Sequence, residues 1–244
     1  MMYYPIWYDT TFLLFIVPVF ILGLIAQLAV QGRFNRYSQV RTLRGLTGAQ
    51  AARAILDANG LVDVAIEETT GFLSDHYDPR TRTLRLSPQV ARGVSVAAMG
   101  VAAHEAGHAI QHASGYFPLQ VRSAIVPAVQ FGSWLGPIII IAGILLEVIF
   151  GAFRLGNTLA WLGVAIFSLV AVFAFITLPV ELDASARARQ LLTHYRIVNQ
   201  QELAGVTSVL NAAAWTYVVA ALAALVQVLH WVMILLSSRS SDSE

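Results

Sequence analysis

The sequence has no cysteine and few charged residues. Without cysteine the chain can form no disulfide, no thiolate metal site and no cysteine nucleophile, so a bound metal must be held by His, Asp or Glu. Charged residues make up 12% of the 244 positions, roughly half the share usual in soluble domains, whereas 57% are apolar. Glycine and proline, at 17 and 8 residues without a repeat, are too few for a collagen-like or disordered chain. The composition is typical of a membrane protein, and the net charge of +1 favours no nucleic-acid partner.

Four stretches are apolar over the roughly 20 residues that a helix needs to cross roughly 30 Å of hydrocarbon. They are residues 11–30, 129–150, 155–180 and 210–236. We interpret the first as an uncleaved membrane anchor, because no positive charge precedes it and the apolar run is too long for a signal peptide. The sequence therefore predicts a mainly α membrane protein with four transmembrane helices.

The distribution of arginine predicts the orientation in the membrane. All fifteen basic residues are arginine, and thirteen of them lie in residues 32–122 and 181–207. Loops rich in arginine normally stay in the cytoplasm. We therefore expect a multi-pass protein of the cell (inner) membrane, with both termini outside and these two segments on the cytoplasmic side.

The spans divide the chain into four predicted parts. Residues 1–31 form the N-terminal anchor, and 32–121 form a small α+β catalytic subdomain at the cytoplasmic face. Residues 122–236 form a three-span membrane region, and the serine-rich segment 237–244 is expected to be a disordered tail.

Local patterns within residues 32–121 predict the order helix, strand, strand, helix. Thr47 and Gln50 have the spacing of a capping box, and Ser87 with a following proline is typical of a second helix start. Apolar residues alternate with polar ones in the two strands. The predicted elements are a helix over 49–58, a strand over 62–67, a strand over 81–86 and a helix over 88–111.

The predicted helix over 88–111 contains an H-E-x-x-H motif formed by His104, Glu105 and His108. Residues four apart lie on one helical face, so both imidazoles can bind the same metal ion. Glu105 lies about 100° around the helix from His104, where a carboxylate can take a proton from metal-bound water. Chance would give roughly 0.004 such motifs in a chain of this composition. The motif therefore predicts a catalytic metal site.

A catalytic zinc site needs a third protein ligand. His112 lies about 12 Å along the helix from His104, which is too far to share the ion, and Ser114 stands where a metzincin would have its third histidine. Glu181 and Asp183 follow the third apolar stretch at the same membrane surface. They lie about 200° apart around a helix, so only one of them can face the metal, and we choose Glu181.

Two motifs give the chain a family resemblance. The sequence HEAGHAIQ at 104–111, followed by LPVELDAS at 178–185, resembles the bacterial membrane zinc metallopeptidases of the YugP type, also called neutral zinc metallopeptidase family 2. The likeness covers nearly the whole chain and includes the stretch at 212–217. It implies a distant kinship to the membrane proteases that remove CAAX tripeptides and to heat-shock membrane proteases.

The resemblance also implies a gluzincin-like site. It has one zinc ion per chain, with His104, His108 and Glu181 as ligands and Glu105 as the base. The membrane proteases that remove CAAX tripeptides and the heat-shock membrane proteases carry Glu-x-x-x-Asp, whereas here Glu181 is followed four residues later by Ser185. This difference leaves open which group orients the histidine ligands.

We therefore expect a zinc-dependent endopeptidase that cleaves peptides or proteins at the cytoplasmic surface of the lipid bilayer. Arg122, His194 and Tyr217 are candidates for stabilising the charged oxygen of the transition state. An extended substrate could pair with the strand at 81–86 or with the segment 71–77.

Three alternatives follow from the same residues. One is a site-2-type intramembrane protease, which would take Asp183 as its third ligand. Another is a non-catalytic chaperone or scaffold with a structural zinc site, which would have no use for Glu105. The lack of paired charges within the spans disfavours a transporter.

Overall fold

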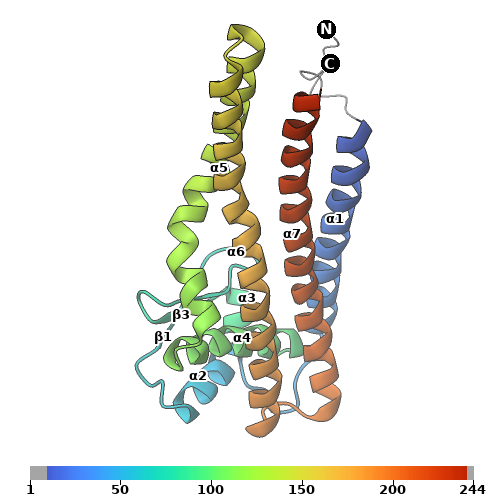
Figure 1. Ribbon diagram of the computed structural model, residues 1–244. Helices are drawn as coiled ribbons and strands as arrows, with labels where there is room; N and C mark the ends of the chain where they lie inside the picture. The colour runs from blue at the N-terminus through green and yellow to red at the C-terminus, as the bar shows by residue number, and fades with distance from the viewer. Residues whose placement is uncertain (1–9, 241–244) are drawn as a thin grey trace. The chain divides into compact units, whose positions relative to one another are not determined.

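The computed structural model describes residues 10–240 and is shown in Figure 1. Over that range it contains seven helices and three strands. In chain order they are α1 (Thr10–Ser38), α2 (Gly48–Ala58), β1 (Ala65–Glu68), β2 (His76–Asp78), β3 (Thr83–Leu86), α3 (Pro88–Ala91), α4 (Val96–Ala113), α5 (Phe117–Phe150), α6 (Phe153–His194) and α7 (Gln200–Ser240).

Four helices are long and apolar enough to cross a membrane, which confirms the mainly α membrane fold. These candidate spans are Leu13–Ser38, Phe117–Phe150, Phe153–His194 and Gln200–Ser237. Their helices extend beyond the apolar stretches of the sequence. Helix α7 continues to Ser240, so the first four residues of the predicted disordered tail are helical, and 241–244 lie outside the described residues.

The chain forms two compact units. The described part of the first comprises residues 10–24, 121–177 and 217–240. Within it α5 and α6 pack closely, because a Cβ atom on Gly143 would lie only 2.5 Å from the carbonyl oxygen of Gly156. Ile140, Ala160 and Val164 are buried at this contact.

The second unit comprises Ile25–Gln120 and Leu178–Thr216 and contains all the predicted zinc ligands. Besides most of the residues of the predicted subdomain, it contains the C-terminal segment of α6 and the start of α7. The reason is its apolar core, in which side chains from these segments pack with those of α2, β3 and α4. Core residues include Ile55, Leu56, Leu84, Leu86, Met99, Leu192, Ile197 and Val206.

The capping prediction for α2 is confirmed. Thr47 Oγ1 accepts a hydrogen bond from Gln50 N, and Gln50 Oε1 accepts one from Thr47 N. Gly60, with φ +76°, follows the end of the helix in the left-handed conformation that glycine adopts readily.

The first predicted strand begins later than expected. Strand β1 starts at Ala65, and the segment before it is a turn with Val62 72% exposed and Val64 buried. The cause is a non-local contact, because the Arg53 guanidinium donates to the carbonyl oxygens of Leu61 (2.7 Å) and Val64 (2.6 Å). Those carbonyls therefore bind a side chain of α2 and no neighbouring strand.

The three strands form a mixed sheet in the order β1-β3-β2. Strand β1 is parallel to β3, with Ile66 opposite Leu84, and β2 is antiparallel to β3, with Tyr77 opposite Leu84. Strand β3 is thus central, and β1 and β2 are the outer strands.

The prediction of a single helix over 88–111 is wrong, because α3 and α4 are separate helices. Ser95 caps α4, since its Oγ accepts a hydrogen bond from Ala98 N. The segment between α3 and α4 also forms backbone hydrogen bonds with the segment that follows α1. Thr42 N donates to Val94 O at 2.9 Å, and Val96 N donates to Val40 O at 2.8 Å.

Candidate metal centre

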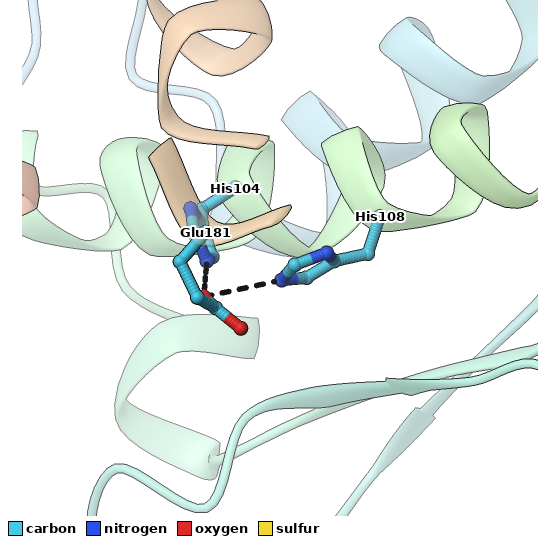
Figure 2. A group of neighbouring side chains, drawn as sticks. All are labelled: His104, His108 and Glu181. Atoms are coloured by element: carbon cyan, nitrogen blue, oxygen red, sulfur yellow. Dashed lines mark hydrogen bonds and ion pairs between the residues drawn. The ribbon is translucent and has the colours of Figure 1, made fainter. Parts of the chain in front are cut away.

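The H-E-x-x-H motif lies in the interior of α4, where His104 and His108 project from one face toward α6 (Figure 2). Glu181 of α6 points into the same space. Its Oε2 atom lies 3.1 Å from His104 Nε2 and 3.5 Å from His108 Nε2. The structure therefore brings together two residues of one turn of α4 and a residue more than seventy positions later.

Small residues allow α4 and α6 to approach closely at this point. A Cβ atom on Gly107 would lie 2.8 Å from the carbonyl oxygen of Ala184, which is closer than real Cβ contacts. Any side chain at position 107 would push the two helices apart. Gly107, between the two histidines, thus helps to set the distance from the imidazoles to Glu181.

The three side chains fit a zinc ion. Zinc bound tetrahedrally at roughly 2.0–2.1 Å has ligand atoms roughly 3.3 Å apart. The two distances to Glu181 match this spacing, and the candidate ligand atoms of all three residues lie within 4.8 Å of one another. Glu181 is only 2% exposed, so its charge needs a partner such as a cation. Two imidazoles and a carboxylate are a ligand set that zinc prefers.

Gln111 orients His108 and is completely buried. Its Oε1 atom lies 2.9 Å from His108 Nδ1, which leaves Nε2 directed at Glu181. Its amide nitrogen donates to Val180 O and to Asp183 Oδ2, both at 2.8 Å. Gln111 therefore connects a histidine of α4 to the helix that carries the third candidate ligand.

Ser185 contacts the other histidine. Its Oγ atom lies 3.1 Å from His104 Nδ1 and can accept the proton of that nitrogen. Glu181 and Ser185 are four residues apart on α6 and thus lie on one face of the helix. The position that differs from the Glu-x-x-x-Asp pattern therefore still provides a hydrogen-bond partner for His104.

Two further carboxylates, those of Glu105 and Asp75, influence the electrostatics of the site. Glu105 is buried, and Asp75 accepts hydrogen bonds from Ser87 N (2.7 Å) and Ser87 Oγ (3.1 Å). Burial raises the pKa of Asp75, and the charge of Glu105 raises it further against the opposing effect of Ser87. For His108, burial opposes the charged form, yet contacts with Glu181 and the charge of Glu105 outweigh it and raise the pKa. The carboxylates of Glu181 and Glu105 thus favour a positively charged group at this position.

The other predicted residues have different surroundings. His112 Nδ1 lies 2.9 Å from the hydroxyl of Tyr77. Asp183 Oδ2 also accepts a hydrogen bond from Arg187 Nε at 2.6 Å, in addition to the bond from Gln111. His194 is exposed and about 20 Å further along α6 than Glu181, so it is not beside the cluster.

Arg122 and Tyr217 belong to the first compact unit, on α5 and α7. Their role as stabilising groups stays a prediction.

Sequence reasoning missed the contacts of Gln111, Ser185 and Asp75. Spacing offered a signal for two of them, since Gln111 is three residues after His108 and Ser185 is four residues after Glu181. No local pattern indicates Asp75, because its position depends on how the loop before β2 folds.

The comparisons with known proteins agree with this site. A family model described as "putative neutral zinc metallopeptidase" matches residues 12–236, and the chain belongs to this family. Over 217 residues the chain is 44% identical to a protein of Bacillus subtilis (strain 168) named "Putative membrane protease YugP". That match covers 89% of this chain and 93% of the relative. No solved structure matches the chain. The resemblance inferred from the two motifs is thereby confirmed.

Proposed function

We propose that the protein is a membrane zinc endopeptidase whose zinc is held by His104, His108 and Glu181, one ion per chain. One observation carries the proposal: the candidate ligand atoms of these three side chains lie within 4.8 Å of one another, and the next residue after His104 is a buried glutamate, Glu105. Family membership supports the same chemistry.

Each residue has a distinct role in hydrolysis. A bound zinc ion supplies a Lewis acid and lowers the pKa of the attacking water. Glu105 would take a proton from that water as its oxygen attacks the peptide carbonyl carbon, and would return the proton to the amine nitrogen as the C–N bond breaks. Gln111 and Ser185 hold the imidazoles with their Nε2 atoms directed at Glu181, so the three ligands would need little reorganisation to bind an ion.

The sheet supports one way of binding a peptide. Strand β3, over 83–86, has neighbours on both sides, so the expectation that this strand pairs with substrate does not hold. Strand β2 is an outer strand in contact with α4, and it follows Asp75 directly. An extended peptide added along β2 would receive backbone hydrogen bonds with little dependence on its side chains.

Two alternatives are less well supported. A site-2-type protease needs Asp183 as a ligand, but this carboxylate is already bonded to Gln111 and Arg187. A scaffold with a structural zinc site does not explain why a glutamate is buried next to His104.

The experiment that tests the proposal is replacement of Glu105 by Gln. We expect Glu105→Gln to keep its zinc and to lose hydrolysis of an unfolded protein substrate by about 10²-fold or more. Glu67→Gln, the same change in the outer strand β1, serves as the control and should leave the rate unchanged. Equal rates in Glu105→Gln and the parent protein, both with zinc bound, would favour the scaffold alternative.

We also propose that the site faces the cytoplasm of a bacterial inner membrane, as the arginine distribution suggests. Because the chain has no cysteine, single cysteines can be introduced directly. Cysteines at Arg154 and Ser240 should react with a membrane-impermeant thiol reagent in intact cells, and those at Arg85 and Gln200 only after permeabilisation. Labelling of position 85 from outside would invert the orientation.

A further inference from the structure

The loop between β1 and β2, residues 69–75, contains an exposed aromatic side chain close to the end of α1. The Phe72 ring packs edge-on against Phe34 of α1, with ring centroids 5.5 Å apart and planes at 89°. Phe34 is buried, whereas Phe72 is 48% exposed. Half of an aromatic ring in this loop is thus left without a protein neighbour among the described residues.

The contact with Phe34 fixes the distance of Phe72 from the hydrocarbon. The apolar run of α1 ends at Val30, and just before that end the side chain of Leu28 is 57% exposed, as expected for a side chain facing lipid. Phe34 comes four residues after Val30, which places it about 6 Å further along the helix. The headgroup layer of a bilayer is about 5–7 Å thick on each side. The end of the apolar run of α1 therefore indicates that Phe72 reaches the depth of the headgroups.

The conformation of the loop holds this ring outward. Gly71 has φ +114° and Leu73 has φ +52°, so the backbone turns sharply on both sides of Phe72. Ser74 Oγ donates to Gly71 O at 3.2 Å, which closes the turn, and Leu73 packs inward against the core. An inward leucine thus anchors the loop, while the neighbouring Phe72 contacts Phe34 and stays about half exposed.

The surroundings suit a lipid surface. Phenylalanine is among the apolar side chains, with Trp and Leu, that interfacial segments insert at the boundary between headgroups and acyl chains. Residues 69–74 carry no acidic group, and Arg33 and Arg36 flank Phe34 on α1. Basic residues at this depth attract anionic headgroups. The partner that fits is the bilayer itself, because the loop contacts α1 at Phe34, four residues after the end of its apolar run.

We propose that the loop 69–75 is a membrane-contacting element that places Phe72 in the headgroup layer. The loop ends at Asp75, which Ser87 holds beside Glu105. A peptide that reaches β2 therefore passes next to lipid, so the preferred substrates are peptide segments lying at the membrane surface. This last consequence rests on the proposed function, whereas the lipid contact does not.

Depth measurements on spin-labelled protein in liposomes test the contact without zinc or activity. Single cysteines at Leu28, Phe72 and Gln200 are labelled, and the collision rates of each label with oxygen and with an aqueous nickel chelate are compared. Leu28 lies within the apolar run, and Gln200 lies ten residues, about 15 Å, before the apolar run of α7. The two positions thus calibrate the hydrocarbon and the water phase.

We expect the label at position 72 to report a depth between those of the two references. Because Phe72→Cys removes the ring, a second variant, Thr70→Cys, places the label on an exposed position of the same loop and leaves Phe72 intact. It should also read an interfacial depth. A label at position 70 that collides with the nickel chelate as often as the label at position 200 would overturn the proposal, whatever position 72 reads.

Discussion

Replacement of Gln111 by Leu tests how the site is organised. The change keeps the size of a fully buried side chain but removes its three hydrogen bonds, to His108 Nδ1, Val180 O and Asp183 Oδ2. Loss of a group that orients a metal-binding histidine typically weakens metal binding about 10–100-fold. We therefore expect the zinc Kd of Gln111→Leu to rise by this factor, which corresponds to about 1.4–2.7 kcal/mol.

The assay is competition for zinc between the purified protein and a chromophoric chelator. Gln89→Leu is the matched control. It is the same chemical change at an exposed position of α3, away from the cluster. Circular dichroism of both variants checks that the helices are retained. If folded Gln111→Leu bound zinc within twofold of Gln89→Leu, the role of Gln111 in orienting His108 would be refuted.

Two further predictions concern the other neighbours of the ligands. Ser185→Ala removes the hydrogen bond to His104 Nδ1 and should weaken zinc binding about tenfold, whereas Ser185→Asp provides a charged acceptor and should bind at least as tightly as the parent. An alanine variant with unchanged affinity would show that His104 needs no such partner. Gly107→Ala should lower both zinc affinity and Tm, because its Cβ would meet Ala184 O at 2.8 Å. Gly32→Ala, with open space around it in α1, should leave zinc affinity unchanged and keep or raise Tm, because alanine stabilises a helix relative to glycine. Equal Tm values for the two would contradict the close helix contact.

The sequence predicted those features that depend on neighbours in the chain. Helix α2 begins where Thr47 and Gln50 predict, because both partners of the capping box lie within one turn. The H-E-x-x-H face of α4 follows from helical periodicity in the same way. Glu181 could be chosen because it was one of two carboxylates that directly follow the third apolar stretch, residues 155–180.

Features that depend on distant contacts were not predictable in this way. The start of β1 was misplaced because Arg53 binds the carbonyls of Leu61 and Val64, which no alternation of apolar residues shows. The break before α4 depends on its pairing with the segment that follows α1. The contact of Asp75 with Ser87 could not be predicted either, since it depends on how the loop before β2 folds.

Zinc content is the most direct test of the central claim, that His104, His108 and Glu181 form one metal site. Mass spectrometry of the purified protein should give about one zinc per chain, and His104→Ala, His108→Ala and Glu181→Ala should each lose it. Asp183→Ala should retain far more zinc than Glu181→Ala, because Asp183 contacts Gln111 and Arg187. Full zinc occupancy in Glu181→Ala, or greater loss in Asp183→Ala, would contradict the assignment.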